Sequence, residues 1–155
     1  MLFRSLGENG NSGMVTGCKA TPGCVAYVGI SYQTQVLQSG LAYAALGNAK
    51  GGYVLPTAAS IAVEAATFVN KTPSNGTISM IYGPTKTGYP IINYEYAIVN
   101  SDQSDSSKAK AIRSVLEWAV NKQFGNSPQF LSQVDFQALP TKVEAQSIKQ
   151  ILKIT

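Results

Sequence analysis

Apolar residues recur every three or four positions in two stretches of the chain, which is the spacing of an amphipathic helix. One stretch predicts a helix over 58–69, where Thr57 is a good N-cap residue and Ile61, Ala65 and Val69 share a face. The other predicts a helix over 108–123 with an apolar stripe that faces the core. This stripe consists of Ile112, Val115, Leu116, Ala119 and Val120. Shorter helices are expected over 12–20, 31–38, 129–134 and 141–153.

Continuous apolar runs rich in β-branched and aromatic residues predict strands between these helices. Runs at 24–30 and 90–99 are interpreted as strands, and Pro90 stands at the first position of its strand, where proline is tolerated. Residues 41–46 and 53–56 flank a glycine-rich turn and predict a hairpin-like pair. Most of 70–88 is expected to be irregular. Helices interleaved with strands indicate a mixed α/β fold.

Composition then narrows the classes of function. Of 155 residues, 45% are hydrophobic and only 13% are charged, about half the usual charged share of a soluble domain. The net charge of +4 comes mostly from scattered lysines, which argues against a nucleic-acid partner. Histidine is absent, so the commonest general base and the commonest metal ligand are both missing. We therefore expect no enzyme activity, no catalytic residue, no cofactor and no metal site.

The N-terminal residues and the two cysteines bear on the compartment. The first six residues are too short for a signal-peptide core, and no apolar stretch reaches the length of a membrane span, so neither is expected in this chain. Cys18 and Cys24 flank a Pro-Gly turn, and they form either a disulfide or two small buried thiols. A metal site is disfavoured because no second cysteine pair follows. The low charge and polar composition favour an extracytoplasmic protein.

A glycine cluster at residues 7–13 precedes the first predicted helix. Backbone N–H groups there, together with the Asn11 amide and the Ser12 hydroxyl, can cradle an anion at the positive end of a helix dipole. The cluster lacks the Gly-Lys-Ser/Thr ending of a P-loop, and too few residues precede it for the strand of a dinucleotide-binding motif. As a motif alone it is a capping loop. The tyrosines and Trp118 are interpreted as packing residues.

Four blocks of the chain resemble, in order, blocks of one known family. They are residues 10–15 with 21–28 and Tyr32, residues 89–99, residues 111–119, and residues 138–140 with Val143. In sequence they read GNSGMV…TPGCVAYV…Y, YPIINYEYAIV, AIRSVLEWA and ALP followed by V. They resemble the phosphate-binding proteins that serve phosphate ABC transporters, the PstS-like family. Four blocks in the same order are more specific than any one of them.

The resemblance implies a three-layer α/β fold of the type II periplasmic-binding-protein kind, with this chain as its C-terminal half. Residues of about 7–70 would end the second lobe and form the hinge, and about 89–155 would return to the first lobe. The family's phosphate contacts lie mostly upstream, in motifs that this sequence lacks, and Arg4 and Arg113 are not at matching positions. Because a desolvated phosphate needs many convergent donors and a charge partner, this half is expected to bind phosphate poorly alone.

The function implied by the resemblance is non-catalytic capture of phosphate or a related oxyanion for an ABC permease, outside the cytoplasm. Gly10, Asn11 and Ser12 are the residues expected to border the binding cleft once another segment supplies the missing half. The alternative is an extracellular binding or scaffold module of the same fold that has lost transport. A small enzyme is the third class. Apolar surface that the other lobe would cover predicts dimerisation.

Overall fold

The structure, a computed structural model, describes residues 5–155. The α-helices are α1 (Gly10–Ala20), α2 (Gln33–Gln38), α3 (Ala58–Ala66), α4 (Ser106–Val120), α5 (Pro128–Leu131) and α6 (Thr141–Ile151). Two 3-10 helices are η1 (Ile30–Tyr32) and η2 (Ser132–Val134). The strands are β1 (Leu46–Gly47), β2 (Tyr53–Val54), β3 (Met80–Ile81) and β4 (Ile91–Ile92). None of the helices in this part of the chain is long and apolar enough to cross a membrane.

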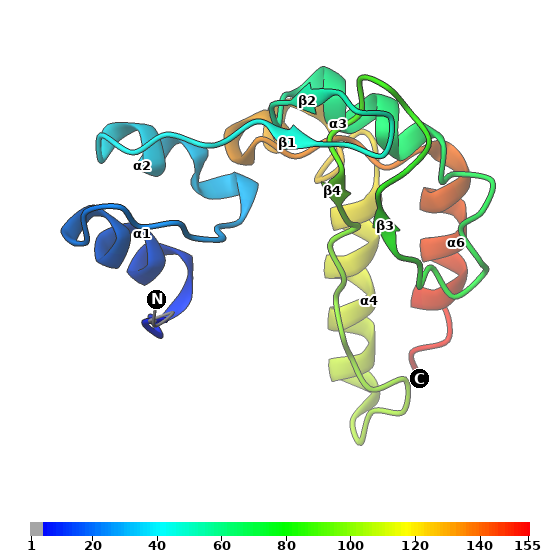
Figure 1. Cartoon of the computed structure of the whole chain (residues 1–155). Coiled ribbons are helices and arrows are strands. Elements are labelled where there is room, and N and C mark those ends of the chain that lie inside the picture. Colours follow the sequence, from blue (N-terminus) through cyan, green and yellow to red (C-terminus); the bar gives the residue numbers. More distant parts are fainter. Residues whose placement is uncertain (1–4) are drawn as a thin grey trace.

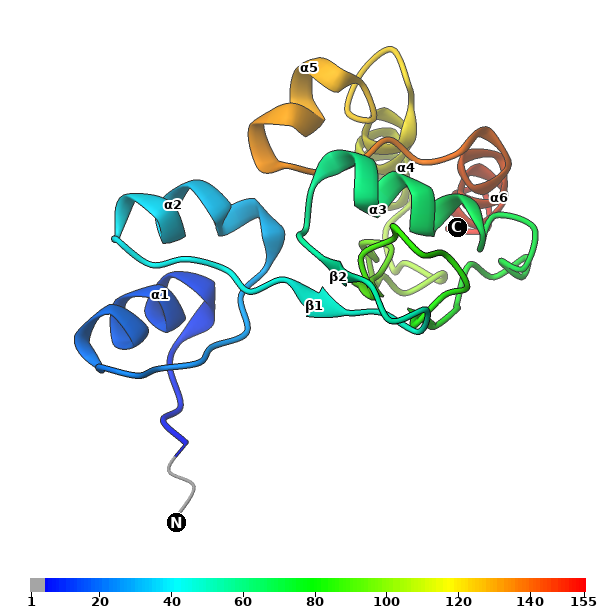
Figure 2. The same cartoon turned by 45° about the horizontal axis from the view of Figure 1, so that its top comes forward.

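The described residues form two parts of unequal size (Figures 1 and 2). The small part contains α1, η1 and α2, and the large part contains everything from α3 to α6. An extended segment at 41–45 leads from the small part into the β1–β2 hairpin. A second connection is the contact between η1 and η2.

The core of the large part lies between α3, the β3–β4 pair and α6. Its buried members are Phe68, Met80, Ile92, Tyr94 and Val143. Strands β3 and β4 are antiparallel, with Met80 opposite Ile92 on the buried face and Ile81 opposite Ile91 on the exposed face. The period of two in a strand therefore decides which isoleucine enters the core. Helix α6 also packs against α4.

Local capping signals explain the starts of the long helices. The Thr57 hydroxyl accepts from the backbone N–H of Ser60, and the Ser60 hydroxyl accepts from the backbone N–H of Thr57, which together form a capping box at α3. The Asp105 carboxylate accepts from the backbone N–H of Ser107 at the start of α4. The expected helices are thus confirmed, although α3 ends earlier and α4 begins earlier than the sequence predicts.

The small part has little core of its own. Val15 of α1 is its buried apolar side chain among the described residues. Cys18 and Cys24 form a disulfide that closes a short loop across the turn after α1. Of the two alternatives that the sequence left open, the structure therefore contains the disulfide and not the free thiols.

The expected three-layer sheet is not present within residues 5–155, which form two two-stranded sheets. The predicted strand at 24–30 is extended without a ladder partner, and only Ile91 and Ile92 of the predicted strand at 90–99 are paired. Burial alternates up to Tyr94 and is then lost, so that Ile98 is 95% exposed. Val25 is 98% exposed for the same reason. Both segments have strand-like sequence but no neighbouring strand in the part of the chain described.

The apolar stripe of α4 was also expected to face the core, and this holds only for part of the stripe. The buried residue of α4 is Ala109, whereas Val115 is 64% exposed and Trp118 is 46% exposed. The ring of Trp118 packs edge-on against Phe130 at 5.2 Å between ring centroids. The helix contacts α6, and Ile112, Leu116 and Val120 are half-buried, whereas Val115 and Ala119 are exposed.

The total surface agrees with these exposed segments. The chain has 10452 Å² of accessible surface. A compact monomer of 16.4 kDa is expected to have about 7,500 Å², so the observed surface is roughly 40% larger. Exposed apolar residues account for part of the excess, and a surface of this kind is typical of a region that another polypeptide covers.

Replacement of Met80 tests the core assignment. Met80→Ala should lower the free energy of unfolding by about 2–5 kcal/mol, because it removes a buried side chain from the Phe68–Tyr94 cluster. Ile81→Ala is the matched control on the exposed face, where the change should stay within about 0.5 kcal/mol. Urea denaturation followed by circular dichroism measures both. Equal losses for the two variants would contradict the assigned register of β3.

Candidate functional site

The residues predicted to border a cleft, Gly10, Asn11 and Ser12, lie together in the first turn of α1. Asn11 Oδ1 accepts from the backbone N–H of Gly29 at 3.0 Å. Ser12 Oγ accepts from Gln35 Nε2 at 3.2 Å. The two side chains therefore connect α1 to the segment before η1 and to α2. In this structure they hold the small part together, and whether they border a binding cleft stays a prediction.

The carboxylate of Glu8 lies along the same helix. A Cβ atom at Gly17 would overlap this carboxylate, and one at Gly13 would lie 3.5 Å from Glu8 Cβ. The two glycines thus leave room for an acidic side chain along α1 between Gly13 and Gly17. This carboxylate adds a negative charge to the same helix and so disfavours the binding of an anion beside it.

Arginine, the usual charge partner of a phosphate, does not reach this glycine cluster within the described residues. Arg113 Nη1 donates to the backbone carbonyl of Ile154 at 2.7 Å, between α4 and the C-terminal residues. Arg4 lies outside the described residues. No group of three or more His, Cys, Asp and Glu side chains within residues 5–155 is arranged to hold a metal ion.

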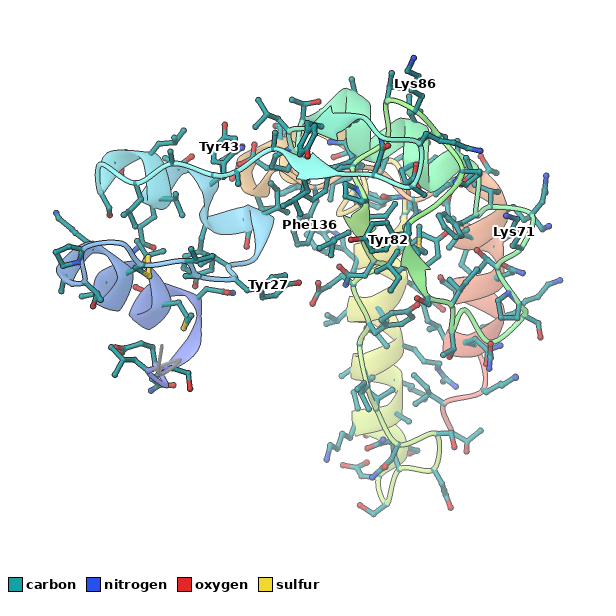
Figure 3. All side chains as sticks on the ribbon, viewed as in Figure 1. Tyr27, Tyr43, Lys71, Tyr82, Lys86 and Phe136 are labelled. Atoms are coloured by element: carbon teal, nitrogen blue, oxygen red, sulfur yellow. A yellow bond between two sulfur atoms is a disulfide. The ribbon has the colours of Figure 1, made fainter. Side chains whose placement is uncertain are left out.

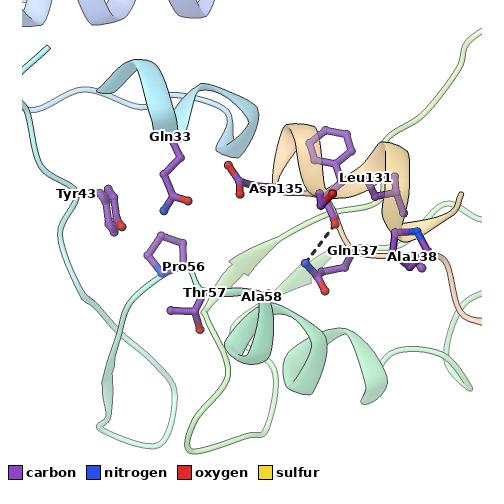
Figure 4. Close-up of a pocket in the computed structure, with 12 residues that line it drawn as sticks. Gln33, Tyr43, Pro56, Thr57, Ala58, Leu131, Asp135, Gln137 and Ala138 are labelled. Carbon is purple, nitrogen blue, oxygen red and sulfur yellow. Dashed lines mark hydrogen bonds between the residues drawn. The ribbon is translucent and has the colours of Figure 1, made fainter. Parts of the chain in front are cut away.

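A pocket of about 530 Å³ lies where the two parts meet (Figure 4). Gln33 and Tyr43 line it from the chain around α2, and Thr57, Asp135 and Gln137 line it from the large part. Asp135 has a left-handed backbone conformation with φ 56°, which aspartate tolerates better than most residues. It is the single charged group among the described lining residues. A phosphate there would meet a carboxylate and no cation, so this pocket is unsuited to an oxyanion.

Tyr27 and Tyr89 form a further link between the two parts. Burial raises the pKa of the Tyr89 phenol, and the nearby Tyr27 raises it further. Tyr27 lies on the extended segment before η1, is 75% exposed and points from the small part toward the large part (Figure 3). Tyr89 therefore remains a neutral hydroxyl where the two parts approach each other.

The large part contains a buried carboxylate, Glu64, that was not predicted from the sequence. Glu64 of α3 is 1% exposed, and its carboxylate accepts a hydrogen bond from the Thr85 hydroxyl. Cβ atoms at Gly83 or Gly88 would overlap the two carboxylate oxygens, so the loop 83–88 closes around Glu64 only because both positions are glycine. Glu64 lies on the same helix face as Ile61 and Phe68, and a charged residue on an apolar face was the available signal.

Asn48 connects the same loop to the β1–β2 hairpin. Its side-chain Nδ2 donates to the carbonyls of Lys86 at 2.8 Å and Gly88 at 3.3 Å. Its Oδ1 accepts from the backbone N–H groups of Lys50 and Gly52, each at 3.0 Å. Asn48 and Glu64 thus fix the hairpin, the loop and α3 relative to one another.

Comparison with known proteins finds weak similarity to one class of binding protein. No protein family model matches the chain. Two curated proteins, each a phosphate-binding protein PstS, from Xylella fastidiosa strains 9a5c and Temecula1, are 27% identical to it over 148 residues. The match covers 94% of this chain but 37% of each of those proteins. This weak similarity supports a relationship to PstS-like proteins, and the chain spans little more than a third of the length of these relatives.

Asn11 is predicted to stabilise the segment before η1. Asn11→Ala removes the acceptor for the Gly29 N–H, a hydrogen bond worth about 1 kcal/mol, so this amide should exchange with deuterium roughly fivefold faster. Ser12→Ala is the control, since Ser12 contacts Gln35 and not Gly29. Hydrogen exchange followed by NMR measures the rate at Gly29. Equal rates in the two variants would mean that Asn11 does not hold this segment.

Gly88 tests the enclosure of Glu64. Gly88→Ala should destabilise the chain by about 1–3 kcal/mol, because the new methyl group must displace the buried carboxylate. Gly7→Ala is the control, since a Cβ there meets nothing within 4 Å. Gly88→Ala should lower the free energy of unfolding less in the Glu64→Ala variant than in the parent chain. Thermal denaturation of the parent, the two single variants and the double variant measures this difference. Strict additivity would contradict the contact.

Proposed function

We propose that this chain is part of a two-lobed binding protein that captures phosphate or a related oxyanion without catalysis and delivers it to an ABC permease. The observation that carries the proposal is the similarity to two phosphate-binding proteins over 94% of the chain. Absence of a catalytic or metal-binding cluster within residues 5–155 is compatible with this role and does not carry it.

The two parts of the structure are proposed to belong to the two lobes. α1, η1 and α2 would end the second lobe, and the large part would belong to the first lobe. Since α3 contacts β4 within the large part, we assign the crossing between lobes to the extended segment at 41–45. Two lobes joined by extended connections can close over a ligand by hinge motion.

We propose further that strands from another segment complete both lobes. The extended residues 24–29 and 95–100 carry exposed apolar side chains, and an unpaired extended segment is a template on which a further strand can pair. The surface excess of about 3,000 Å² over a compact monomer exceeds the 1,200–2,000 Å² of a standard interface. We propose that a segment corresponding to the additional length of the PstS relatives supplies these strands.

An extracytoplasmic location is proposed from the disulfide together with the similarity. Disulfides persist in oxidising compartments and are rare in the cytosol. Gly10, Asn11 and Ser12 are proposed to support the cleft border in the completed protein. Their side chains orient the start of α1 through Gly29 and Gln35.

The second candidate function is an extracellular binding or scaffold module of the same fold without transport. It is favoured by two observations: Arg113 donates to the carbonyl of Ile154, and no Lys or Arg of the described residues lines the pocket between the two parts. Phosphate binding by the completed protein separates the two candidates.

Calorimetric titration with phosphate tests the proposed function. The 155-residue chain alone should give no saturable heat at millimolar phosphate, because the described residues supply no convergent cationic donors. The chain joined to the upstream segment of a PstS relative should bind at least 100-fold more tightly, while sulfate serves as the competing oxyanion. Tight binding by the chain alone would overturn the proposal of a partial chain. A folded joined protein that binds no phosphate would favour the scaffold module.

A further inference from the structure

A second pocket adjoins the first, with which it shares Thr57, and is lined by residues within 52–63 together with Lys86 and Thr87. It measures about 520 Å³ and has three walls, which are strand β2 with its flanking residues, the first turns of helix α3, and the loop 83–88. Its lining residues are Gly52, Tyr53, Val54, Leu55, Thr57, Ala59, Ser60, Val63, Lys86 and Thr87. We call it the β2–α3 groove. Figures 1 and 2 show β2 running beside α3 in both views.

One wall of the groove is a free strand edge. β1 and β2 form a two-stranded antiparallel sheet in which Gly47 is opposite Tyr53. The Asn48 N–H donates to the Gly52 carbonyl at 2.8 Å, so the neighbouring pair of Gly47 and Tyr53 is a non-hydrogen-bonded pair. The N–H and C=O of Tyr53 consequently point away from β1. They present one donor and one acceptor to an incoming strand.

The walls are fixed relative to one another. Asn48 bonds the loop at Lys86 and Gly88 and the hairpin at Gly52. The carboxylate of Glu64, one turn beyond Ser60 on α3, accepts a hydrogen bond from the Thr85 hydroxyl of the loop. A rigid groove loses little conformational entropy when a ligand binds, which favours affinity.

The groove is apolar with one positive charge at its rim. Tyr53 is 83% exposed, Leu55 is 44% exposed and Val63 is 42% exposed. Lys86 is the only charged residue among the described lining residues, and Figure 3 shows it pointing outward from the loop. The nearby carboxylate of Glu64 is buried beneath the loop and bonded to Thr85. The surface therefore complements a ligand that is apolar and negatively charged.

We propose that the β2–α3 groove binds an extended peptide segment of a partner protein, with branched apolar side chains next to a carboxylate. The segment adds to β2 as a strand through the N–H and C=O of Tyr53, in the mode of strand addition to a sheet edge. Its apolar side chain covers Leu55 and Val63, and its carboxylate approaches the Lys86 ammonium. The proposal does not depend on phosphate binding.

Peptide selection tests this proposal on the whole chain. A phage-displayed library of random octapeptides is panned on the immobilised 155-residue protein, and the most enriched peptide is synthesised with a fluorescent label. The expected consensus has Val, Ile or Leu beside Asp or Glu. Lys86→Glu should weaken binding of this peptide at least tenfold in fluorescence polarisation, and a peptide with Lys in place of its acid should bind Lys86→Glu better than the parent chain.

Two controls separate this site from general charge effects. Lys71→Glu changes the same net charge on a different loop and should leave the affinity unchanged. The peptide should also slow hydrogen exchange at the Tyr53 amide, which contact through side chains alone does not do. Lys86→Gln keeps the test valid if the charge reversal disturbs folding, and it should weaken binding by a smaller factor.

Three results would overturn the proposal. The first is a library without an acidic and apolar consensus. The second is an enriched peptide that binds Lys86→Glu as tightly as the parent chain or leaves the Tyr53 amide unprotected. The third is a stable dimer in sedimentation that Tyr53→Lys dissociates, because the groove would then belong to a second copy of this chain.

Discussion

Apolar side chains of an extended segment become buried only where a neighbouring strand pairs with it, and this dependence explains the most unusual features of the structure. Where a partner strand exists within the described residues, as for Met80 and Ile92, the chain forms a buried core. Where none exists, as around Val25 and Ile98, the same kind of apolar sequence lies in solvent. The exposed apolar side chains of these segments contribute to the large accessible surface. The chain matches little more than a third of the length of the PstS proteins to which it is similar.

Local features of the fold could be predicted from the sequence, because the interactions that form them lie within a few residues. Thr57 and Asp105 begin helices through side-chain bonds to the next turn, and the Pro-Gly turn brings Cys18 and Cys24 to bridging distance. The three-layer fold was an implication of the family resemblance, and residues 5–155 contain two two-stranded sheets. The burial of the α4 stripe could be predicted only in part, because periodicity shows that a residue such as Val115 needs cover and not whether cover is present. Long-range partners decide that outcome.

The candidate site shows the same division. Placing Gly10, Asn11 and Ser12 together at a helix start required only local sequence, and the structure agrees with that placement. Their bonds to Gly29 and Gln35 depend on how α1 packs, which no motif reports. No motif marks Glu64, although its position on the face of Ile61 and Phe68 indicates burial. A charged residue on an apolar helix face therefore carries more information than its spacing from other acids.

The disulfide has a consequence for how the chain must be produced. The small part buries Val15 and little else, so the covalent bond between Cys18 and Cys24 supplies much of its order, and closing a loop of this length is worth about 2 kcal/mol. The large part has its own core and no cysteine. In a reducing cytosol the disulfide would not form, so the large part would fold while the small part would be less ordered. Both the small part and the large part are expected to be ordered when the protein is secreted into an oxidising medium, where the disulfide forms.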